Sequence, residues 1–350
     1  MLNAASAGML RLMPRIPDSA KKVLLGGKTI TIDGNTLDTT LQFMLTLQKS
    51  SGVGGLVASS DVAVARTQLR KLAKFITADI AVGVRDLTVT GAMGPLRARH
   101  YAPVNASTEP LLVFFHGGGF VVGDIETHDA LCRLICRDAE VHVLSVEYRL
   151  APEHKAPAAT EDAYAAYQWA VAHVGELGAD PARIAVGGDS AGGNLAAAVA
   201  QLARKKGAPA PALQLLIYPV TNYSSGDTRS KTLFAEGFFL AKKDIDWFEA
   251  HYLGGAAIDA SDSRISPLLA DDLSGLPPAL VVTAGFDPLR DEGTQYAEAM
   301  AAAGVPVDHR QFGSLIHGFA NFFPLGGGSA SATAELVSAL RAHLSRAERA

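Results

Sequence analysis

The chain has 350 residues, of which 48% are hydrophobic, and a formal net charge of −4. This length fits one large α/β domain or two smaller ones, and the charge balance indicates no nucleic-acid partner. No stretch approaches the 18 consecutive apolar residues of a membrane span. Near the N-terminus, Arg11 and Arg15 interrupt the apolar residues and no cleavage site follows, so we expect no secretory signal.

The predicted elements, taken in chain order, fall into two parts. Residues 1–82 are predicted to be helical, with amphipathic stretches over 37–48 and 62–76, and we interpret them as an N-terminal cap segment. Residues 83–350 begin with a hairpin-like pair of strands at 86–89 and 96–101. Apolar strands then alternate with helical segments, and they are expected at 111–115, 141–147, 183–187, 213–218, 279–284 and 306–312. This alternation predicts an α/β fold with a mostly parallel central sheet and helices on both faces.

A glycine-rich turn follows the first of these apolar strands. The run at 111–115 leads directly into His116 and the three glycines at 117–119. Bare backbone N–H groups suit the stabilisation of an oxyanion. The alternative, a phosphate-binding turn, needs a G-x-G-x-x-G or G-K-[ST] pattern, which this turn lacks. We interpret His116 as an anchor of the turn.

The pattern G-x-S-x-G at 188–192 places Ser190 between a predicted strand and an alanine-rich helix. This context is typical of a nucleophile elbow, a strained turn that presents the serine Oγ to the substrate. A second oxyanion donor is then expected from the residue after the nucleophile, Ala191. The alternative interpretation is a glycine-rich loop without a catalytic role.

A serine nucleophile needs a base and an acid that orients the base. Asp287 follows a predicted strand, at the active edge of an α/β sheet, whereas Asp291 is better placed to open the next helix. His317 follows the acid, lies in a loop and precedes a glycine. His309 is the alternative base, but a position inside a strand limits its reach. The order Ser190, Asp287, His317 is that of α/β-hydrolases.

Together these motifs resemble the hormone-sensitive lipase family of carboxylesterases, whose bacterial branch is often called family IV. The matching segments are HGGGF at 116–120, YRLAPEH at 148–154, GDSAGGN at 188–194, DPL at 287–289 and HGF at 317–319. The resemblance implies an α/β-hydrolase fold with a helical cap. It implies that Ser190 is the nucleophile, Asp287 the acid and His317 the base. It also implies an oxyanion hole formed by Gly118, Gly119 and Ala191.

The segment between the strands at 213–218 and 279–284 is longer than a single crossover helix needs. We interpret residues 220–265 as a cap insertion that shields an acyl pocket together with the N-terminal helices. Phe238, Phe239 and Trp247 are the predicted substrate-binding residues. The alternative is that these aromatic side chains only dock a helix on the core.

The motifs predict a carboxylesterase that acts on small-molecule esters with short to medium acyl chains. An aryl amide deacetylase or amidase with the same triad is an alternative. A ligand receptor on this fold, like the plant gibberellin receptors, is a second alternative, which the presence of His317 disfavours.

Cofactors and cellular context follow from what the chain lacks. No metal-ligand cluster is visible, so we expect neither a metal nor another cofactor. Cys132 and Cys136 are spaced for neither a good disulfide nor a zinc site, which predicts reduced thiols in a cytoplasmic protein. The oligomeric state stays open, with a homodimer as one option.

Overall fold

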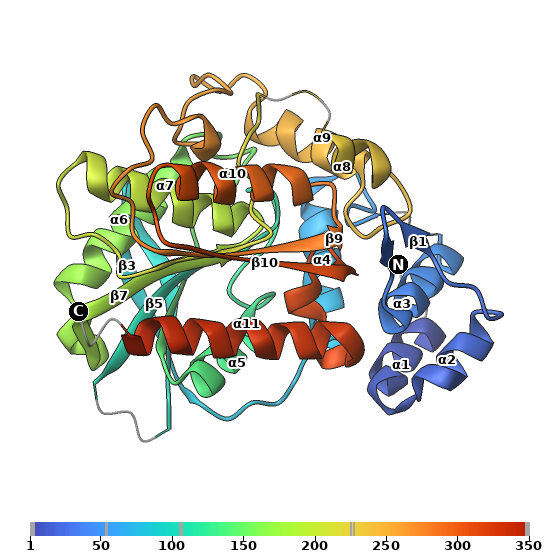
Figure 1. Ribbon diagram of the computed structural model, residues 1–350. Helices are drawn as coiled ribbons and strands as arrows, with labels where there is room; N and C mark the ends of the chain where they lie inside the picture. Colours follow the sequence, from blue (N-terminus) through green and yellow to red (C-terminus); the bar gives the residue numbers. More distant parts are fainter. Residues whose placement is uncertain (1–3, 53–54, 105–107, 225, 227, 347–350) are drawn as a thin grey trace.

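An eight-stranded sheet forms the centre of the molecule (Figure 1). The computed structural model describes residues 4–346 apart from 53–54, 105–107, 225 and 227. In spatial order the strands are β10 (Val307–Ile316), β9 (Ala279–Phe286), β8 (Gln214–Ile217), β7 (Ala179–Asp189), β5 (Glu109–Phe115), β6 (His142–Val146), β4 (Gly94–Ala102) and β3 (Gly83–Gly91). Neighbouring strands from β10 to β6 are parallel, whereas β4 is antiparallel to β6 and β3. The predicted mostly parallel sheet is confirmed.

The last strand is longer than predicted. The sequence indicates a strand over 306–312, but β10 continues to Ile316 through an irregularity after Phe312. Ile316 pairs with Phe286 at the end of β9. The extension matters because it delivers His317 to the carboxyl edge of the sheet, next to the residue that follows β9.

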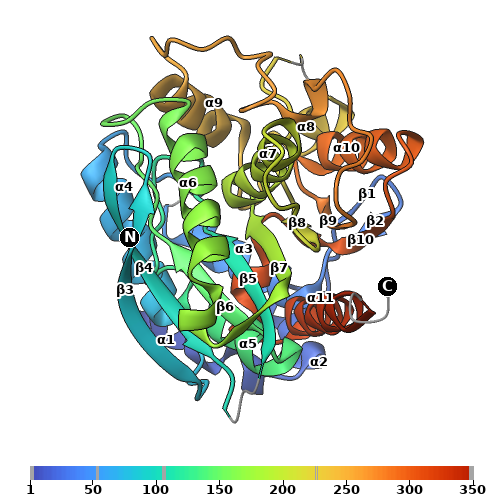
Figure 2. The same ribbon diagram turned by 90° about the vertical axis from the view of Figure 1, so that its left-hand side faces the viewer.

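Helices cover both faces of the sheet (Figures 1 and 2). On one face lie α6 (Ala158–Ala172), α7 (Ala191–Lys205) and α10 (Arg290–Ala302); on the other lie α5 (Asp129–Ala139) and α11 (Gly327–Arg346). Successive side chains of a strand point to opposite faces. Along β5, Val113 therefore packs in the core on the α7 side, whereas Leu112 and Phe114 pack on the α11 side. Both faces of β5 are buried, which explains its continuous apolar sequence.

The N-terminal residues form several short elements beside the sheet. They are α1 (Ala4–Leu12), the 3₁₀ helix η1 (Met13–Arg15), α2 (Asp18–Leu24), β1 (Thr31–Ile32), β2 (Asn35–Thr36), α3 (Thr39–Ser50) and α4 (Val62–Phe75). The β1–β2 hairpin was not predicted; its turn at Asp33 and Gly34 has positive φ at both positions. The Asp38 and Asp61 carboxylates each accept a backbone N–H bond of 3.0 Å in the first turn of α3 and α4. These caps determine where the two helices begin.

The segment after β8 carries α8 (Arg229–Leu233), α9 (Lys242–Tyr252) and the 3₁₀ helix η3 (Pro267–Leu269). The buried Asp244 carboxylate, in the first turn of α9, accepts N–H bonds from Leu56 at 2.9 Å and Val57 at 3.2 Å. The Trp247 indole N–H donates to the Ser60 carbonyl at 3.3 Å. The loop before α4 is thus joined to α9, although the two segments lie far apart in the sequence.

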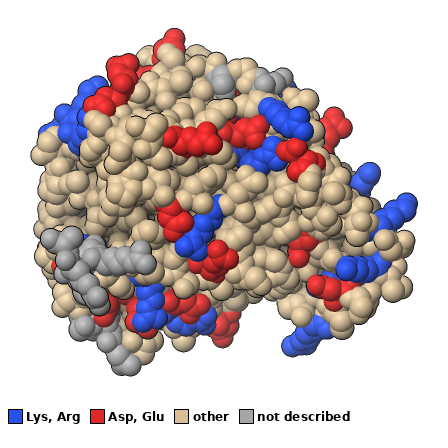
Figure 3. Space-filling model, viewed as in Figure 1, with Lys and Arg blue, Asp and Glu red and all other residues tan. Residues whose placement is uncertain are grey.

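Charged side chains of both signs are mixed on the face shown in Figure 3. Among the described residues visible there, acidic and basic groups lie near one another, and no broad basic patch covers the surface. A large single-sign basic surface is the usual footprint of nucleic-acid binding. Within the described ranges, no helix is both long enough and apolar enough to cross a membrane.

Candidate active site

Ser190 lies at the tight turn between β7 and α7. Its backbone has φ 56° and ψ −118°, a conformation that costs energy for a residue with a side chain. The turn requires the flanking glycines: a Cβ atom on Gly188 or Gly192 would lie 2.3 or 1.8 Å from the Phe115 carbonyl oxygen. The G-x-S-x-G pattern therefore has a steric cause, because the elbow packs directly against the end of β5.

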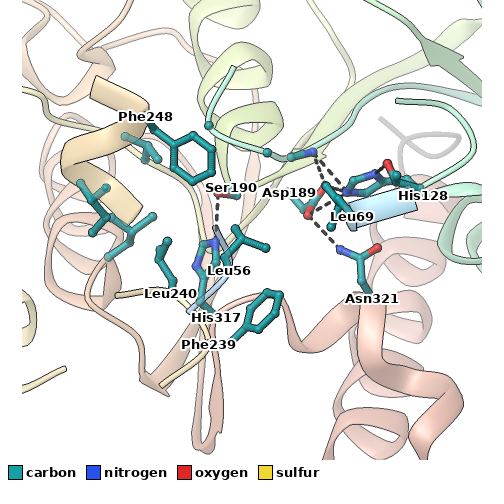
Figure 4. Close-up of a pocket in the computed structure, with 18 of the residues that line it drawn as sticks. Leu56, Leu69, His128, Asp189, Ser190, Phe239, Leu240, Phe248, His317 and Asn321 are labelled. Carbon is teal, nitrogen blue, oxygen red and sulfur yellow. Dashed lines mark hydrogen bonds and ion pairs between the residues drawn. The ribbon is translucent and has the colours of Figure 1, made fainter. Parts of the chain in front are cut away.

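The structure brings the three predicted triad residues into one hydrogen-bonded chain. Ser190 Oγ lies 3.0 Å from His317 Nε2 (Figure 4), and His317 Nδ1 lies 2.8 Å from Asp287 Oδ2. Asp287 is fully buried, and its Oδ1 accepts the Leu289 N–H at 2.8 Å. Since a carboxylate only accepts, His317 Nδ1–H donates to Asp287. Nε2 is then the acceptor for the Ser190 hydroxyl proton.

The alternative acid and base lie elsewhere. Asp291 Oδ2 accepts the Ser230 N–H at 2.8 Å, which joins the start of α10 to α8. His309 lies inside β10, and its Nε2 is 3.1 Å from Thr283 Oγ1 on the neighbouring strand. Among the described residues, neither side chain forms a hydrogen bond with the triad.

The glycine-rich turn after β5 presents its backbone to the site. Gly118 and Gly119 have φ values of 121° and 59°, which favour glycine. A Cβ atom on Gly119 would lie 2.3 Å from the Phe248 ring. The N–H groups of both glycines donate to no other group within the described part of the chain. Ala191 begins α7, where the first N–H groups have no partner inside the helix. These three N–H groups are the predicted oxyanion donors.

The buried side chain of His116 packs against this glycine-rich turn and bonds to it. Its Nδ1–H donates to the Gly117 carbonyl at 2.8 Å, and the Tyr148 hydroxyl donates to the His116 carbonyl at 2.6 Å. The Tyr148 ring stacks on the imidazole with 4.4 Å between centroids. Burial, together with the neighbouring His128, lowers the pKa of His116 to about 4. The imidazole is therefore neutral, and its contacts fit an anchoring role.

Asp189, which the sequence analysis did not single out, connects the parts of the site. Its buried carboxylate accepts the Gly117 N–H at 2.8 Å and the Asn321 amide N–H at 3.0 Å, and it lies 3.1 Å from His128 Nε2 (Figure 4). Burial disfavours both charges, but their attraction holds the pKa of Asp189 below its usual value and that of His128 above. Asp189 thus joins the elbow to the oxyanion turn, to α5 and to η4 (Phe319–Leu325).

The segment at 148–154 is tied to its neighbours by charged side chains. Arg149 Nε–H donates to Asp162 Oδ2 at 2.7 Å. Glu153 accepts two bonds of 2.8 Å from Arg66 on α4, whose Nε–H also donates to the Val121 carbonyl. These contacts give Arg149 and Glu153 a structural role, and they hold α4 above the oxyanion turn.

A cavity opens above Ser190 and His317 between α4 and the α8–α9 segment. Leu69 and Leu72 line it from α4, and Ile76 lines it directly after the end of this helix. Further apolar lining residues are Leu56, Phe239, Leu240, Ile245 and Phe248. Figure 4 shows Phe248 and Phe239 on two sides of the Ser190–His317 pair. The cavity suits an apolar substrate portion with its reacting carbonyl near the serine.

Of the three predicted substrate-binding residues, only Phe239 lines this cavity. The Phe238 ring instead packs in the core, 5.4 Å from the Phe234 centroid and 5.3 Å from that of Phe286. Trp247 lies outside the lining and packs against Phe248, which takes its place at the cavity wall. The prediction for Phe238 and Trp247 is corrected, because adjacent residues in this segment point in different directions. The sequence feature that came closest to this result was the pair of adjacent aromatic residues Trp247 and Phe248.

Comparison with known proteins links this geometry to ester hydrolases. Carboxylic ester hydrolase LipN of Mycobacterium tuberculosis is 56% identical to this chain, over 96% of this chain and 91% of LipN. Carboxylesterase NlhH of the same organism is 42% identical, over 81% of this chain and 90% of NlhH. The solved structure of the ester hydrolase EH1AB1, from the metagenome of Lake Arreo, is 40% identical. It superposes with a TM-score of 0.84 and covers 88% of this chain and 99% of its own.

A protein family described by its alpha/beta hydrolase fold matches residues 112–321. The chain belongs to this family, within the hormone-sensitive lipase group of carboxylic ester hydrolases that its motifs resemble. The predicted family and the α/β-hydrolase fold are thereby confirmed.

Proposed function

We propose that this enzyme hydrolyses carboxylic esters with short to medium acyl chains, through Ser190, His317 and Asp287. The observation that carries the proposal is the unbroken chain of contacts from Ser190 Oγ through the imidazole to the buried carboxylate. The ester hydrolases among its relatives support the type of bond that is cleaved.

The geometry supports a two-step acyl transfer. His317 Nε2 takes the Ser190 hydroxyl proton while Oγ bonds to the ester carbonyl carbon, whose oxygen becomes negatively charged. The N–H groups of Gly118, Gly119 and Ala191 bind that oxyanion. The imidazolium then protonates the leaving alcohol oxygen as the C–O bond breaks. Water then attacks the acyl-enzyme and gives a proton to His317. The imidazolium passes this proton to Ser190 Oγ as the bond between Oγ and the acyl carbon breaks, which releases the free acid and restores the serine.

We also propose that residues 1–82 and the insertion at 220–265 act as a cap on the catalytic domain, residues 83–350. The Asp244 bonds to Leu56 and Val57, the Arg66 contacts and the position of Phe248 over the oxyanion turn support this division. A cap that excludes water strengthens the electrostatic contacts to the oxyanion. A closed end to the acyl pocket favours chains of about C4 to C8, since methylenes beyond the end gain no burial.

The direct test is hydrolysis of p-nitrophenyl esters from C2 to C16 by the wild type and by Ser190→Ala, beside one aryl amide. Loss of the nucleophile should lower kcat by roughly 10⁴ to 10⁶. A variant that keeps a tenth of wild-type turnover rules Ser190 out. A higher kcat/KM for the amide than for its matched ester favours the amidase alternative.

A cytoplasmic location is proposed from the two cysteines on α5. Both are free and buried, and burial raises the pKa of Cys136 to about 12. Unpaired thiols fit a reducing compartment. Cell fractionation tests this location, and gel filtration with light scattering tests the homodimer that the sequence leaves open.

A further inference from the structure

The cavity above the catalytic serine has two chemically different ends. Leu69 and Leu72 on α4, with Ile76 directly after it, form an apolar wall, which is shared with a second apolar cavity between α3 and α4. Lys231 from α8 and Glu249 from α9 line the same space, and we call the part that they line the polar end. The hydrolytic steps use neither side chain. Polar groups in a mostly apolar cavity usually orient a ligand.

Lys231 is held from behind by a buried acid. Its Nζ lies 2.9 Å from Glu292 Oε2, and the two side chains are 11% and 0% exposed. Glu292 Oε1 accepts the Thr221 N–H at 2.8 Å, so the carboxylate is itself fixed. An ammonium group has three N–H donors, and among the described residues Glu292 is the one ion-pair partner of Lys231. The other donors are available to a ligand in the cavity.

Glu249 and Tyr223 complete this polar end. Both line the cavity, and within the described ranges neither the Glu249 carboxylate nor the Tyr223 hydroxyl forms a hydrogen bond or ion pair. Both Lys231 and Glu249 line this one cavity, and burial raises the pKa of Glu249 while Lys231 opposes this shift. The polar end therefore offers N–H donors from Lys231, an acceptor from Glu249 and a hydroxyl that does either.

We propose that this polar end binds a hydroxyl group on the alcohol part of the substrate, so that esters of diols and polyols are preferred over esters of simple alkanols. The inference rests on the proposed ester hydrolysis. A hydroxyl accepts from Lys231 while it donates to Glu249, so both partly buried groups are satisfied. The apolar end along α4 is left for the acyl chain.

Charged substrate groups fit this end less well. The polar end contains two carboxylates, Glu249 and Glu292, and one cation, Lys231. An added anion is therefore repelled. An added ammonium group would lie beside Lys231 itself. A neutral group with both donor and acceptor capacity meets neither repulsion.

The test compares 2-hydroxyethyl butyrate with propyl butyrate, which carry a hydroxyl and a methyl group at the same position. We expect wild-type kcat/KM, measured by acid release in a pH-stat, to be about tenfold higher for the hydroxyethyl ester. The ratio should fall towards one in Glu249→Leu and in Lys231→Met. Asp246→Asn, a matched change of an exposed carboxylate on α9 that pairs with Lys242, should keep the wild-type ratio.

Each outcome decides between explanations. A wild-type ratio near one, or a ratio that survives both substitutions, refutes the hydroxyl site while hydrolysis of propyl butyrate leaves the proposed function intact. A higher kcat/KM for a carboxymethyl or trimethylammonioethyl ester refutes the preference for a neutral group. If the wild type hydrolyses no ester, the proposed function fails and the inference fails with it. Ratios within one variant are insensitive to partial loss of folded protein.

Discussion

At the scale of single residues, two buried carboxylates have different tasks. Asp287 accepts from His317, the proposed base, whereas Asp189 joins the elbow to Gly117, His128 and Asn321. A buried carboxylate keeps its charge only where hydrogen bonds or an opposite charge compensate the loss of water. Replacing each by its amide therefore has distinct consequences.

Asp287→Asn should lower kcat by roughly 10⁴, because an amide in this position favours the wrong tautomer of His317. Asp291→Asn is the matched control, since Asp291 forms no hydrogen bond with the triad and bonds instead to Ser230; the charge that it places at a helix start contributes about 0.3–1 kcal/mol of stability. For both variants, kcat and kcat/KM are measured on p-nitrophenyl butyrate. The reverse ranking of the two variants would overturn the assignment of the acid.

Asp189→Asn should lower the free energy of unfolding by up to about 3–5 kcal/mol, because His128 is left as an uncompensated buried charge. Deprotonation of His128 removes the uncompensated charge and so reduces this loss of stability. The double variant Asp189→Asn/His128→Gln removes both charges. Its loss in free energy of unfolding should therefore be smaller than the sum of the losses in the two single variants. Urea unfolding of the four proteins measures this coupling, and strictly additive effects would contradict it.

At the scale of elements, the elbow depends on the close packing of α7 against the end of β5. Gly192→Ala places a methyl group 1.8 Å from the Phe115 carbonyl oxygen, so the turn must shift. We expect a loss of at least about 1–3 kcal/mol in stability, as for other overpacked sites, and a strongly reduced kcat. Gly175→Ala is the matched control, since nothing lies within 4 Å of its added methyl group. Equal melting temperatures for the two variants would argue against a steric role.

The segment between α8 and α9 contributes one aromatic ring to the cavity and buries its neighbour. Phe239→Ala should move the acyl-chain optimum towards longer esters, because the cavity wall recedes. Phe238→Ala should instead lower stability by about 3–5 kcal/mol, as expected for a core phenylalanine, and keep the wild-type chain-length profile. The profiles from C2 to C16 and thermal unfolding distinguish the two. A shift in Phe238→Ala alone would show that the wall is assigned to the wrong ring.

At the scale of the whole molecule, buried neutral histidines link stability to pH. Burial lowers the pKa of His100 to about 4, with a further contribution from His142, whose ring stacks on it at 5.1 Å. His116 is lowered to about the same value. In the unfolded chain these imidazoles bind protons near pH 6.5. The unfolded state therefore binds more protons between about pH 6.5 and 4, and stability is lost as the pH falls through this window.

His100→Gln removes one of these groups and should flatten the decline in stability between pH 6.5 and 4. His154→Gln, at an exposed position, is the matched control and should keep the wild-type slope. Urea unfolding at several pH values measures each slope. If His100→Gln and His154→Gln behave alike, His100 is not a source of the acid sensitivity.

The sequence alone was sufficient for the family, for the alternation of strands and helices after residue 82, and for the triad candidates; it missed the β1–β2 hairpin. Ser190 could be identified because a strand, a tight turn and a helix are encoded by adjacent residues. Asp287 and His317 each follow a strand, and parallel strands end at one edge of the sheet. The positions of these three residues depend on local sequence or on the order of the strands along the chain. They can therefore be predicted without knowledge of the tertiary structure.

Only the tertiary structure decided which of two adjacent side chains lines the cavity and which distant residues contact each other. It selected Phe239 over Phe238 and Phe248 over Trp247 for the cavity wall, because packing against distant segments determines which of two adjacent side chains points inward. It also made Asp189 a connection between segments that lie far apart in sequence. Burial and long-range contacts arise only when the chain folds, because they depend on segments that are far apart in the sequence. The type and spacing of neighbouring residues therefore do not predict them.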